Sequence, residues 1–121
     1  MCILVVDDEA ITLMANSSCL EDAGREVLTA LDGVAALRLV DERAAHFTCL
    51  VTDYNMPRGV TGAELIERMR QSYPAIPMVL ATALVGAVSY TWLVQNQVEL
   101  LQKPYAPEEL VAIVERLLGQ A

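Results

Sequence analysis

Short apolar runs alternate five times with longer helix-like segments, and this alternation limits the possible folds more than any other feature of the chain. The runs cover residues 2–6, 26–30, 49–52, 78–81 and 98–101. Three of them are continuous and rich in Val, Ile and Leu, which is typical of parallel strands buried on both faces. The run at 26–30 mixes polar and apolar residues and predicts an edge strand.

Helix signals fall between these runs. Gly24 is placed to end the first helix, and Asp32 is a candidate N-cap of the second. Residues 61–64 have the spacing of a capping box that opens the third helix. The fourth helix is expected within residues 87–96, and Pro107 stands in the first turn of the fifth.

Five β–α units in 121 residues predict one α/β domain, residues 1–121, with a doubly wound five-stranded parallel sheet and helices on both faces. Hydrophobic residues make up 55% of the chain, which indicates a compact core. In folds of this kind, ligands bind outside the carboxyl ends of the strands. The polar residues at the strand ends are therefore the candidates for function.

Composition and local sequence also limit the partners and the cellular location that can be expected of the protein. A formal net charge of −8 argues against nucleic acid as a direct partner. Residues 75–88 are apolar but interrupted, so no membrane span is expected, and no signal peptide is seen. Cys2, Cys19 and Cys49 form no paired motif and are expected to be buried, reduced thiols. These features together predict a cytoplasmic protein.

A distinctive polar residue follows four of the five runs. Asp7 and Asp8 follow the first, Asp53 the third, Thr82 the fourth and Lys103 the fifth. If the first and third strands are neighbours, three carboxylates meet in one pocket and repel each other. Mg²⁺ prefers oxygen ligands and would remove this conflict, and the lysine adds a mobile positive charge.

One of these carboxylates would then act as a nucleophile, and the loop after the third run points to Asp53. An aspartate that attacks phosphorus forms an acyl phosphate. Such a transfer needs alignment of the groups and neutralisation of the phosphoryl oxygens. Mg²⁺, Lys103 and the Thr82 hydroxyl would supply that neutralisation.

The chain resembles the response-regulator receiver family of two-component signalling over its whole length. The resemblance lies in the order and spacing of four segments, each at its expected strand end: 5–9 (Val-Val-Asp-Asp-Glu), 51–57 (Val-Thr-Asp-Tyr-Asn-Met-Pro), 80–83 (Leu-Ala-Thr-Ala) and 102–105 (Gln-Lys-Pro-Tyr). It implies a flavodoxin-like strand order 2-1-3-4-5. It also implies a phosphoacceptor that takes a phosphoryl group from a phosphohistidine with Mg²⁺, and that catalyses at most its own slow dephosphorylation.

The resemblance implies roles for the residues of the acidic pocket. Asp53 matches the phosphoacceptor, and Asp8 matches a direct Mg²⁺ ligand. Asp7 would act nearby or through water, and the backbone carbonyl of Asn55 would be a further ligand of the metal.

The resemblance also implies how the phosphoryl group is sensed. Thr82 and Lys103 match the residues that contact it, and Pro104 matches a proline that usually follows a cis peptide bond. The expected signalling surface consists of Leu100, Trp92 and Tyr105.

Three positions depart from the family pattern. The loop at 58–61 is one residue longer than is common. Leu100 occupies a position that is usually Tyr or Phe. Leu84, two residues after Thr82, is apolar at a position that influences hydrolysis of the acyl phosphate in relatives.

The resemblance implies a sensor histidine kinase or a histidine phosphotransfer protein as partner. Residues 61–65 and 101–105 are similar to receivers at the C-terminus of hybrid sensor kinases. A homodimer through the face of the fourth helix, fifth strand and fifth helix is an open alternative to a monomer. A free-standing regulator and an excised receiver both fit the sequence.

Three other functions compete with this interpretation. A pseudo-receiver would keep the fold and act only in protein interactions. An aspartate-based phosphohydrolase would need Asp-x-Asp after the first strand, where residues 7–9 read Asp-Asp-Glu. A flavodoxin-like cofactor binder would need a phosphate-cradling loop there.

His46 has no acidic or cysteine partner at ligand spacing and is expected to face solvent.

Overall fold

The computed structural model describes residues 2–42, 47–56, 59–84 and 86–119. These residues form one parallel sheet in the order β2-β1-β3-β4-β5. The strands are β1 (Cys2–Val6), β2 (Val27–Ala30), β3 (Phe47–Asp53), β4 (Met78–Thr82) and β5 (Val98–Gln102). The helices are α1 (Ala10–Asp22), α2 (Gly33–Glu42), α3 (Gly62–Ser72), α4 (Tyr90–Asn96) and α5 (Pro107–Leu117). The predicted fold class, strand order and edge position of β2 are confirmed.

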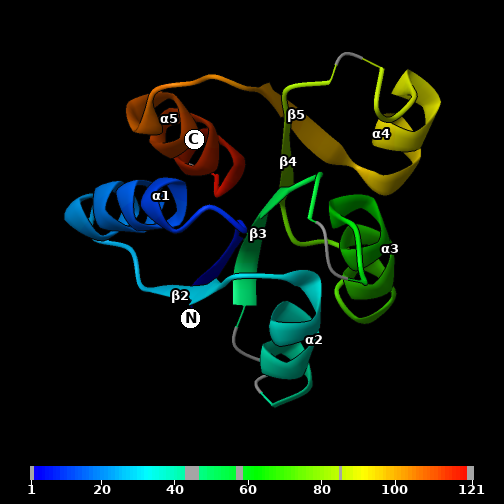
Figure 1. The fold of residues 1–121 in the computed structure, drawn as a ribbon, viewed down its shortest axis with the longest axis horizontal. Helices are drawn as coiled ribbons and strands as arrows, with labels where there is room; N and C mark the ends of the chain where they lie inside the picture. Colours follow the sequence, from blue (N-terminus) through cyan, green and yellow to red (C-terminus); the bar gives the residue numbers. More distant parts are fainter. Residues whose placement is uncertain (1, 43–46, 57–58, 85, 120–121) are drawn as a thin grey trace.

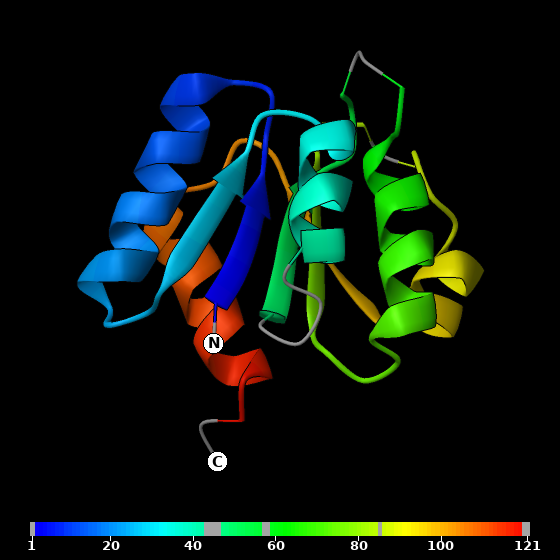
Figure 2. The same ribbon diagram turned by 90° about the horizontal axis from the view of Figure 1, so that it is seen from below.

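The helices cover both faces of the sheet. Figure 1 shows α1 and α5 on one side and α2, α3 and α4 on the other. Side chains alternate along β1 to serve both layers: Ile3 and Val5 pack toward α1 and α5, whereas Leu4 and Val6 pack toward α2 and α3. Figure 2 shows the strands running in one direction, so their carboxyl ends meet at one edge.

The predicted helix signals have the expected contacts. The side chain of Asp32 accepts a hydrogen bond from the Ala35 N–H at 2.7 Å. Thr61 and Glu64 form a reciprocal capping box at the start of α3. Gly24 follows α1 with a φ of +89°, a conformation in which a Cβ would be strained.

Helix α4 lies at the surface and is attached through polar contacts and through the ring of Trp92. None of its seven described residues is buried. The indole N–H of Trp92 donates to the Glu67 carboxylate in α3 at 2.7 Å, and the ring packs at the margin of the core. The Arg70 guanidinium donates to the carbonyls of Asn96 and Gln97 at 3.0 and 3.2 Å. Polar contacts of this kind can be exchanged at lower cost than buried apolar packing.

The prediction of three buried thiols is wrong for two of them. Cys49 is buried in β3, but Cys2 and Cys19 are only partly buried, and all three are free. Cys2 lies at the first position of its strand and Cys19 on the flank of α1, where neighbours cover them incompletely. Burial raises the pKa of Cys49 to about 12.

Two expectations fall partly or wholly outside the described residues. His46 lies outside them, and the longer loop at 58–61 is described only from Gly59 onward. Among the described residues, no helix has the length and apolar character needed to cross a bilayer.

Gly62 fixes the distance between α3 and the end of β3. A Cβ at this position would lie 2.8 Å from the Cα of Tyr54 and would also clash with the carbonyl oxygen of Asp53. Both obstacles are backbone atoms, which cannot rotate away. The start of α3 therefore packs directly on the peptide that positions Asp53.

We expect Gly62→Ala to lower the free energy of unfolding by about 2–3 kcal/mol, because the added methyl group forces backbone atoms apart. Gly24→Ala is the matched control: a Cβ there meets nothing within 4 Å, so only the positive φ is penalised, at about 1 kcal/mol. Urea unfolding of both variants measures the difference. A Gly62→Ala loss no larger than that of Gly24→Ala would contradict the close backbone contact.

Candidate functional site

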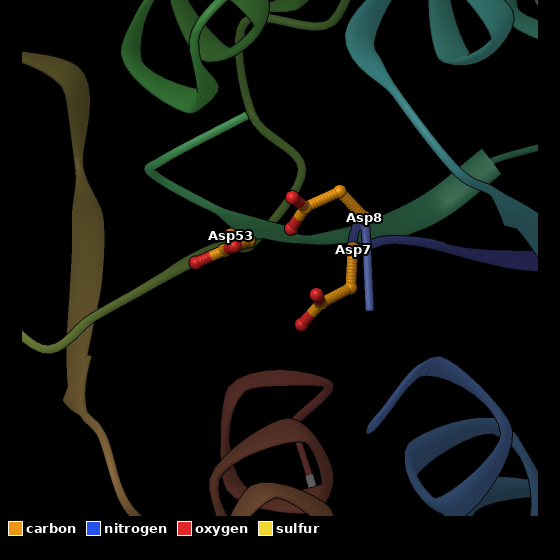
Figure 3. A group of neighbouring side chains, drawn as sticks. All are labelled: Asp7, Asp8 and Asp53. Atoms are coloured by element: carbon orange, nitrogen blue, oxygen red, sulfur yellow. The ribbon is translucent and has the colours of Figure 1, made fainter. Parts of the chain in front are cut away.

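Three carboxylates meet at the carboxyl edge of the sheet. Asp7 and Asp8 follow β1, and Asp53 is the last residue of β3, which pairs directly with β1. Carboxylate oxygens of all three lie within 4.8 Å of one another. Figure 3 shows the side chains converging on the same space. The convergence predicted from neighbouring first and third strands is therefore present.

Among the residues that the structure describes, the cation in contact with this cluster is Lys103, after β5. Its Nζ lies 3.2 Å from Asp53 Oδ1 and 3.4 Å from Asp7 Oδ2. The exposed carboxylate of Glu9 is more distant, at 3.9 Å. Asp7 and Asp53 are only 2% and 5% exposed, whereas Asp8 is open to solvent. One lysine compensates only one of the three negative charges.

Burial shifts the ionisation of the two enclosed carboxyls. It raises the pKa of Asp53 to about 6; the charges of Asp7 and Asp8 add to the rise and Lys103 opposes it. Burial also raises the pKa of Asp7, against the hydrogen bond that its Oδ1 accepts from the Glu9 N–H. Burial alone would lower the pKa of Lys103, but the charges of Asp53 and Asp7 outweigh it and raise that pKa.

Asp8, Glu9 and Asp53 line a pocket of about 380 Å³. Besides the acidic side chains and Lys103, its wall includes Asn55, Thr82 and Leu84. The Thr82 hydroxyl is buried and accepts a hydrogen bond from the Leu84 N–H at 3.0 Å, which leaves its own hydrogen to donate. The Lys103 N–H donates to the Thr82 carbonyl at 2.9 Å, so the ends of β4 and β5 are joined directly beneath the pocket.

The donor set fits a hard divalent cation. Three carboxylates supply anionic oxygens at one place, and exposed Asn55 lines the same pocket. Mg²⁺ commonly binds through one or two carboxylates together with water and phosphate oxygens. An uncompensated negative charge and an open mouth are both consistent with such an ion.

The three residues expected to form a signalling surface lie in different places. Leu100 is 42% exposed on β5, in a shallow groove with Tyr90 and Leu93. Trp92 turns toward α3 and bonds to Glu67 there. Tyr105 lies on the α1 side, where its hydroxyl accepts a hydrogen bond from Asn16. The Lys103–Pro104 peptide is cis, as the resemblance implied.

Sequence reasoning missed Asn16 and Glu9. Asn16 is buried in α1, at helical spacing from Leu13 and Leu20 on the face that packs on the sheet. An amide at a position where the helix period expects an apolar residue was a readable signal. Glu9 was noticed only as part of an acidic run, and its approach to Lys103 depends on how the chain turns after β1.

Comparison with known proteins agrees with this geometry. Residues 3–115 match the family model described as the response regulator receiver domain. A protein-glutamate methylesterase/protein-glutamine glutaminase of Anaeromyxobacter dehalogenans is 36% identical over 105 residues, which are 84% of this chain. The structure of chemotaxis protein CheY4 of Vibrio cholerae superposes with a TM-score of 0.83 at 31% identity, covering 97% of this chain and 98% of that one.

A second solved structure is similar to the same extent. The receiver domain of the hybrid histidine kinase CckA superposes with a TM-score of 0.81 at 28% identity, covering 98% of this chain and 99% of that one. Curated relatives are longer proteins, of which the chain spans from 25% to 57% in three examples, including 29% of the methylesterase. The family match covers nearly all of the described residues, with the acidic pocket at the expected strand ends. The chain therefore belongs to the response regulator receiver domain family.

Proposed function

We propose that Asp53 accepts a phosphoryl group from a phosphohistidine, and that this modification switches the contacts of Thr82 and Lys103. The observation that supports this most is the position of the Lys103 ammonium, 3.2 Å from Asp53 at the edge of a three-carboxylate cluster. A pocket with one buried nucleophile and an adjacent cation suits an incoming group of high negative charge.

The reaction is a substitution at phosphorus. A carboxylate oxygen of Asp53 forms a new bond to phosphorus, and the bond between phosphorus and the histidine nitrogen breaks. The electron pair of the broken bond stays on the imidazole, which is neutral once its ring carries one proton. Asp53 must be ionised to attack; its raised pKa of about 6 still leaves the carboxylate as the main form near neutral pH.

A Mg²⁺ ion held by Asp8, Asp53 and Asp7 or its water, with the Asn55 carbonyl, would neutralise negative charge on the phosphoryl oxygens. The protein's own groups supply the rest. The ammonium of Lys103 already lies next to the acceptor carboxylate, and Thr82 lines the same pocket with a hydroxyl that can donate.

The signal would leave through the loop after β4. If the Thr82 hydroxyl turns toward a phosphoryl oxygen, its hydrogen bond from the Leu84 N–H changes. That loop leads into α4, whose attachment through Trp92 and Arg70 is polar. Leu100 cannot provide the ring rotation that an aromatic residue provides at this position in relatives. We therefore assign the main response to α4.

The proposed donor is a sensor histidine kinase or a histidine phosphotransfer protein. Among similar structures, the receiver of a hybrid histidine kinase supports a kinase-linked partner. The pseudo-receiver alternative is disfavoured because Asp8, Asp53, Thr82 and Lys103 together line one pocket. The groove with Leu100 and Tyr90, on the α4–β5–α5 face, is the surface on which a homodimer would form.

Incubation with acetyl phosphate and Mg²⁺ should add one phosphoryl group, which peptide mass spectrometry should place on Asp53. The chelated protein should be labelled at least about tenfold more slowly, because charge neutralisation is lost. Asp53→Asn should remain unlabelled, whereas Asp41→Asn, an exposed acid on α2, should behave as wild type. Wild-type labelling of Asp53→Asn would refute the assignment.

Without metal, Asp53→Asn should stabilise the protein by up to about 3 kcal/mol near neutral pH. The folded-state pKa of about 6 lies above the ordinary value near 4, so the folded protein binds more protons between these values. The contribution of Asp53 to wild-type stability therefore falls as pH rises through this window, and the benefit of the substitution should vanish below about pH 4. Unfolding in a chelating buffer at several pH values tests this, with Asp41→Asn as control. A benefit independent of pH would contradict the burial effect.

Beryllofluoride with Mg²⁺ should change the emission of Trp92, the single tryptophan of the chain, because its hydrogen bond to Glu67 reports the position of α4. The change should be absent in Thr82→Ala and reduced in Glu67→Gln. Unchanged emission in wild type, under conditions in which Asp53 is occupied, would exclude α4 as the responding element.

A further inference from the structure

Asn16 is a buried polar residue on an apolar helix face. It is 3% exposed and lies on the side of α1 that packs on the sheet, with Leu13 and Leu20 on the same face. A buried amide destabilises a fold unless its polar atoms are paired. An apolar residue would fill this position without that requirement. Packing alone therefore does not explain an asparagine here.

The partner of Asn16 comes from the other end of the chain. Its Nδ2 donates to the Tyr105 hydroxyl at 2.7 Å, a contact between residues 89 positions apart. Tyr105 is partly buried, and its ring packs against the apolar cluster between the sheet, α1 and α5. The hydrogen bond therefore fixes the hydroxyl of Tyr105, whose ring is already held by apolar packing.

Tyr105 belongs to the short segment, residues 103–106, that joins β5 to α5. Lys103 is only two residues before it. Asn16, Tyr105, Pro104 and Lys103 line one groove of about 340 Å³, which shares Glu9 and Lys103 with the acidic pocket. The anchored tyrosine and the stem of the lysine are thus parts of one wall.

The Lys103 ammonium has three carboxylate partners at similar distances. Its distances to Asp53, Asp7 and Glu9 are 3.2, 3.4 and 3.9 Å. A displacement of the Lys103–Tyr105 segment by less than 1 Å would be enough to change which carboxylate it prefers, since coulombic energy varies with distance. The contacts that fix the Lys103–Tyr105 segment therefore help to decide whether the ammonium pairs with Asp53.

We infer that Asn16 and Tyr105 are positioning residues, whose hydrogen bond holds the Lys103 segment so that the ammonium favours Asp53. The same bond ties α1, which begins directly after Asp7, Asp8 and Glu9, to the segment that carries Lys103. The inference rests on the proposed function in one respect: it takes Asp53 as the phosphoacceptor that the ammonium must contact.

The test uses Asn16→Leu, Tyr105→Phe and the double variant, which remove the hydrogen bond and keep apolar bulk. Ser17→Ala, on the neighbouring residue of α1, is one control. Tyr73→Phe is the other: its buried hydroxyl has no hydrogen-bond partner among the described residues, so its removal breaks no such contact. If Asn16→Leu fails to fold, Tyr105→Phe decides alone, because it keeps the ring.

The first measurement is the NMR resonance of the Lys103 side chain in the metal-free protein. Both single variants should shift it, the double variant should shift it no further, and the controls should leave it in place. The second is the affinity for beryllofluoride in the presence of Mg²⁺, with its fluorine spectrum at Asp53. Each single variant should weaken binding about five- to tenfold, again without a further loss in the double variant.

The outcomes separate the two proposals. If wild type does not bind beryllofluoride at Asp53, the proposed function fails, and the Lys103 resonance still decides the positioning role. Variants that lose stability while the lysine resonance remains at the wild-type position would show a purely structural hydrogen bond and overturn the inference. Independent, additive effects of the two substitutions would overturn it as well.

Discussion

Repulsion among Asp7, Asp8 and Asp53 is the constraint on which the rest of this structure depends. Parallel pairing of β1 with β3 forces the three carboxylates to within 4.8 Å, and the apolar strands beneath them exclude water from two of the three. Lys103 compensates one charge only, and burial raises the pKa of Asp53 to about 6, with the charges of Asp7 and Asp8 adding to the rise. In the metal-free protein the Asp53 carboxyl is therefore costly to ionise, and any cation or charged group that enters the pocket changes this balance directly.

The contacts around the pocket divide the molecule into a firmly held side and a loosely held one. On the firm side, α1 is tied to the β5–α5 segment through Asn16 and Tyr105, and a bidentate ion pair at 2.7 and 2.8 Å joins Arg25 to Glu115 in α5. On the loose side, α4 has no buried residue among its seven and depends on hydrogen bonds from Trp92 and Arg70. Switching needs elements with two accessible arrangements, and polar attachment allows these more readily than close packing does.

Much of the fold was predictable because its signals are local. Runs of Val, Ile and Leu located the strands, and Asp32, Thr61 and Gly24 marked helix ends through contacts within three residues. The acidic site followed from strand ends, since topology alone brings Asp53 to Asp7. Exposure and long-range partners were not predictable in this way. The orientation of Tyr105 depends on Asn16, 89 positions away, and the packing of Trp92 depends on Glu67 in another helix. A local sequence pattern contains neither of these long-range contacts, and the signalling role of Leu100, Trp92 and Tyr105 stays a prediction.

The firmly held side and the loosely held side of the molecule meet at Lys103. Its backbone N–H is bonded to the Thr82 carbonyl, at the start of the segment that leads to α4, while the chain after it runs to Tyr105 and the anchored side. The lysine therefore lies at the boundary between the firmly held side and the loosely held side. If phosphorylation displaces Thr82, as proposed, and the lysine segment is held in place, the displacement should appear in α4 rather than spread over the whole edge of the sheet. Under the proposed function, an anchored Lys103 would therefore favour a conformational response in α4 over one spread around the whole pocket.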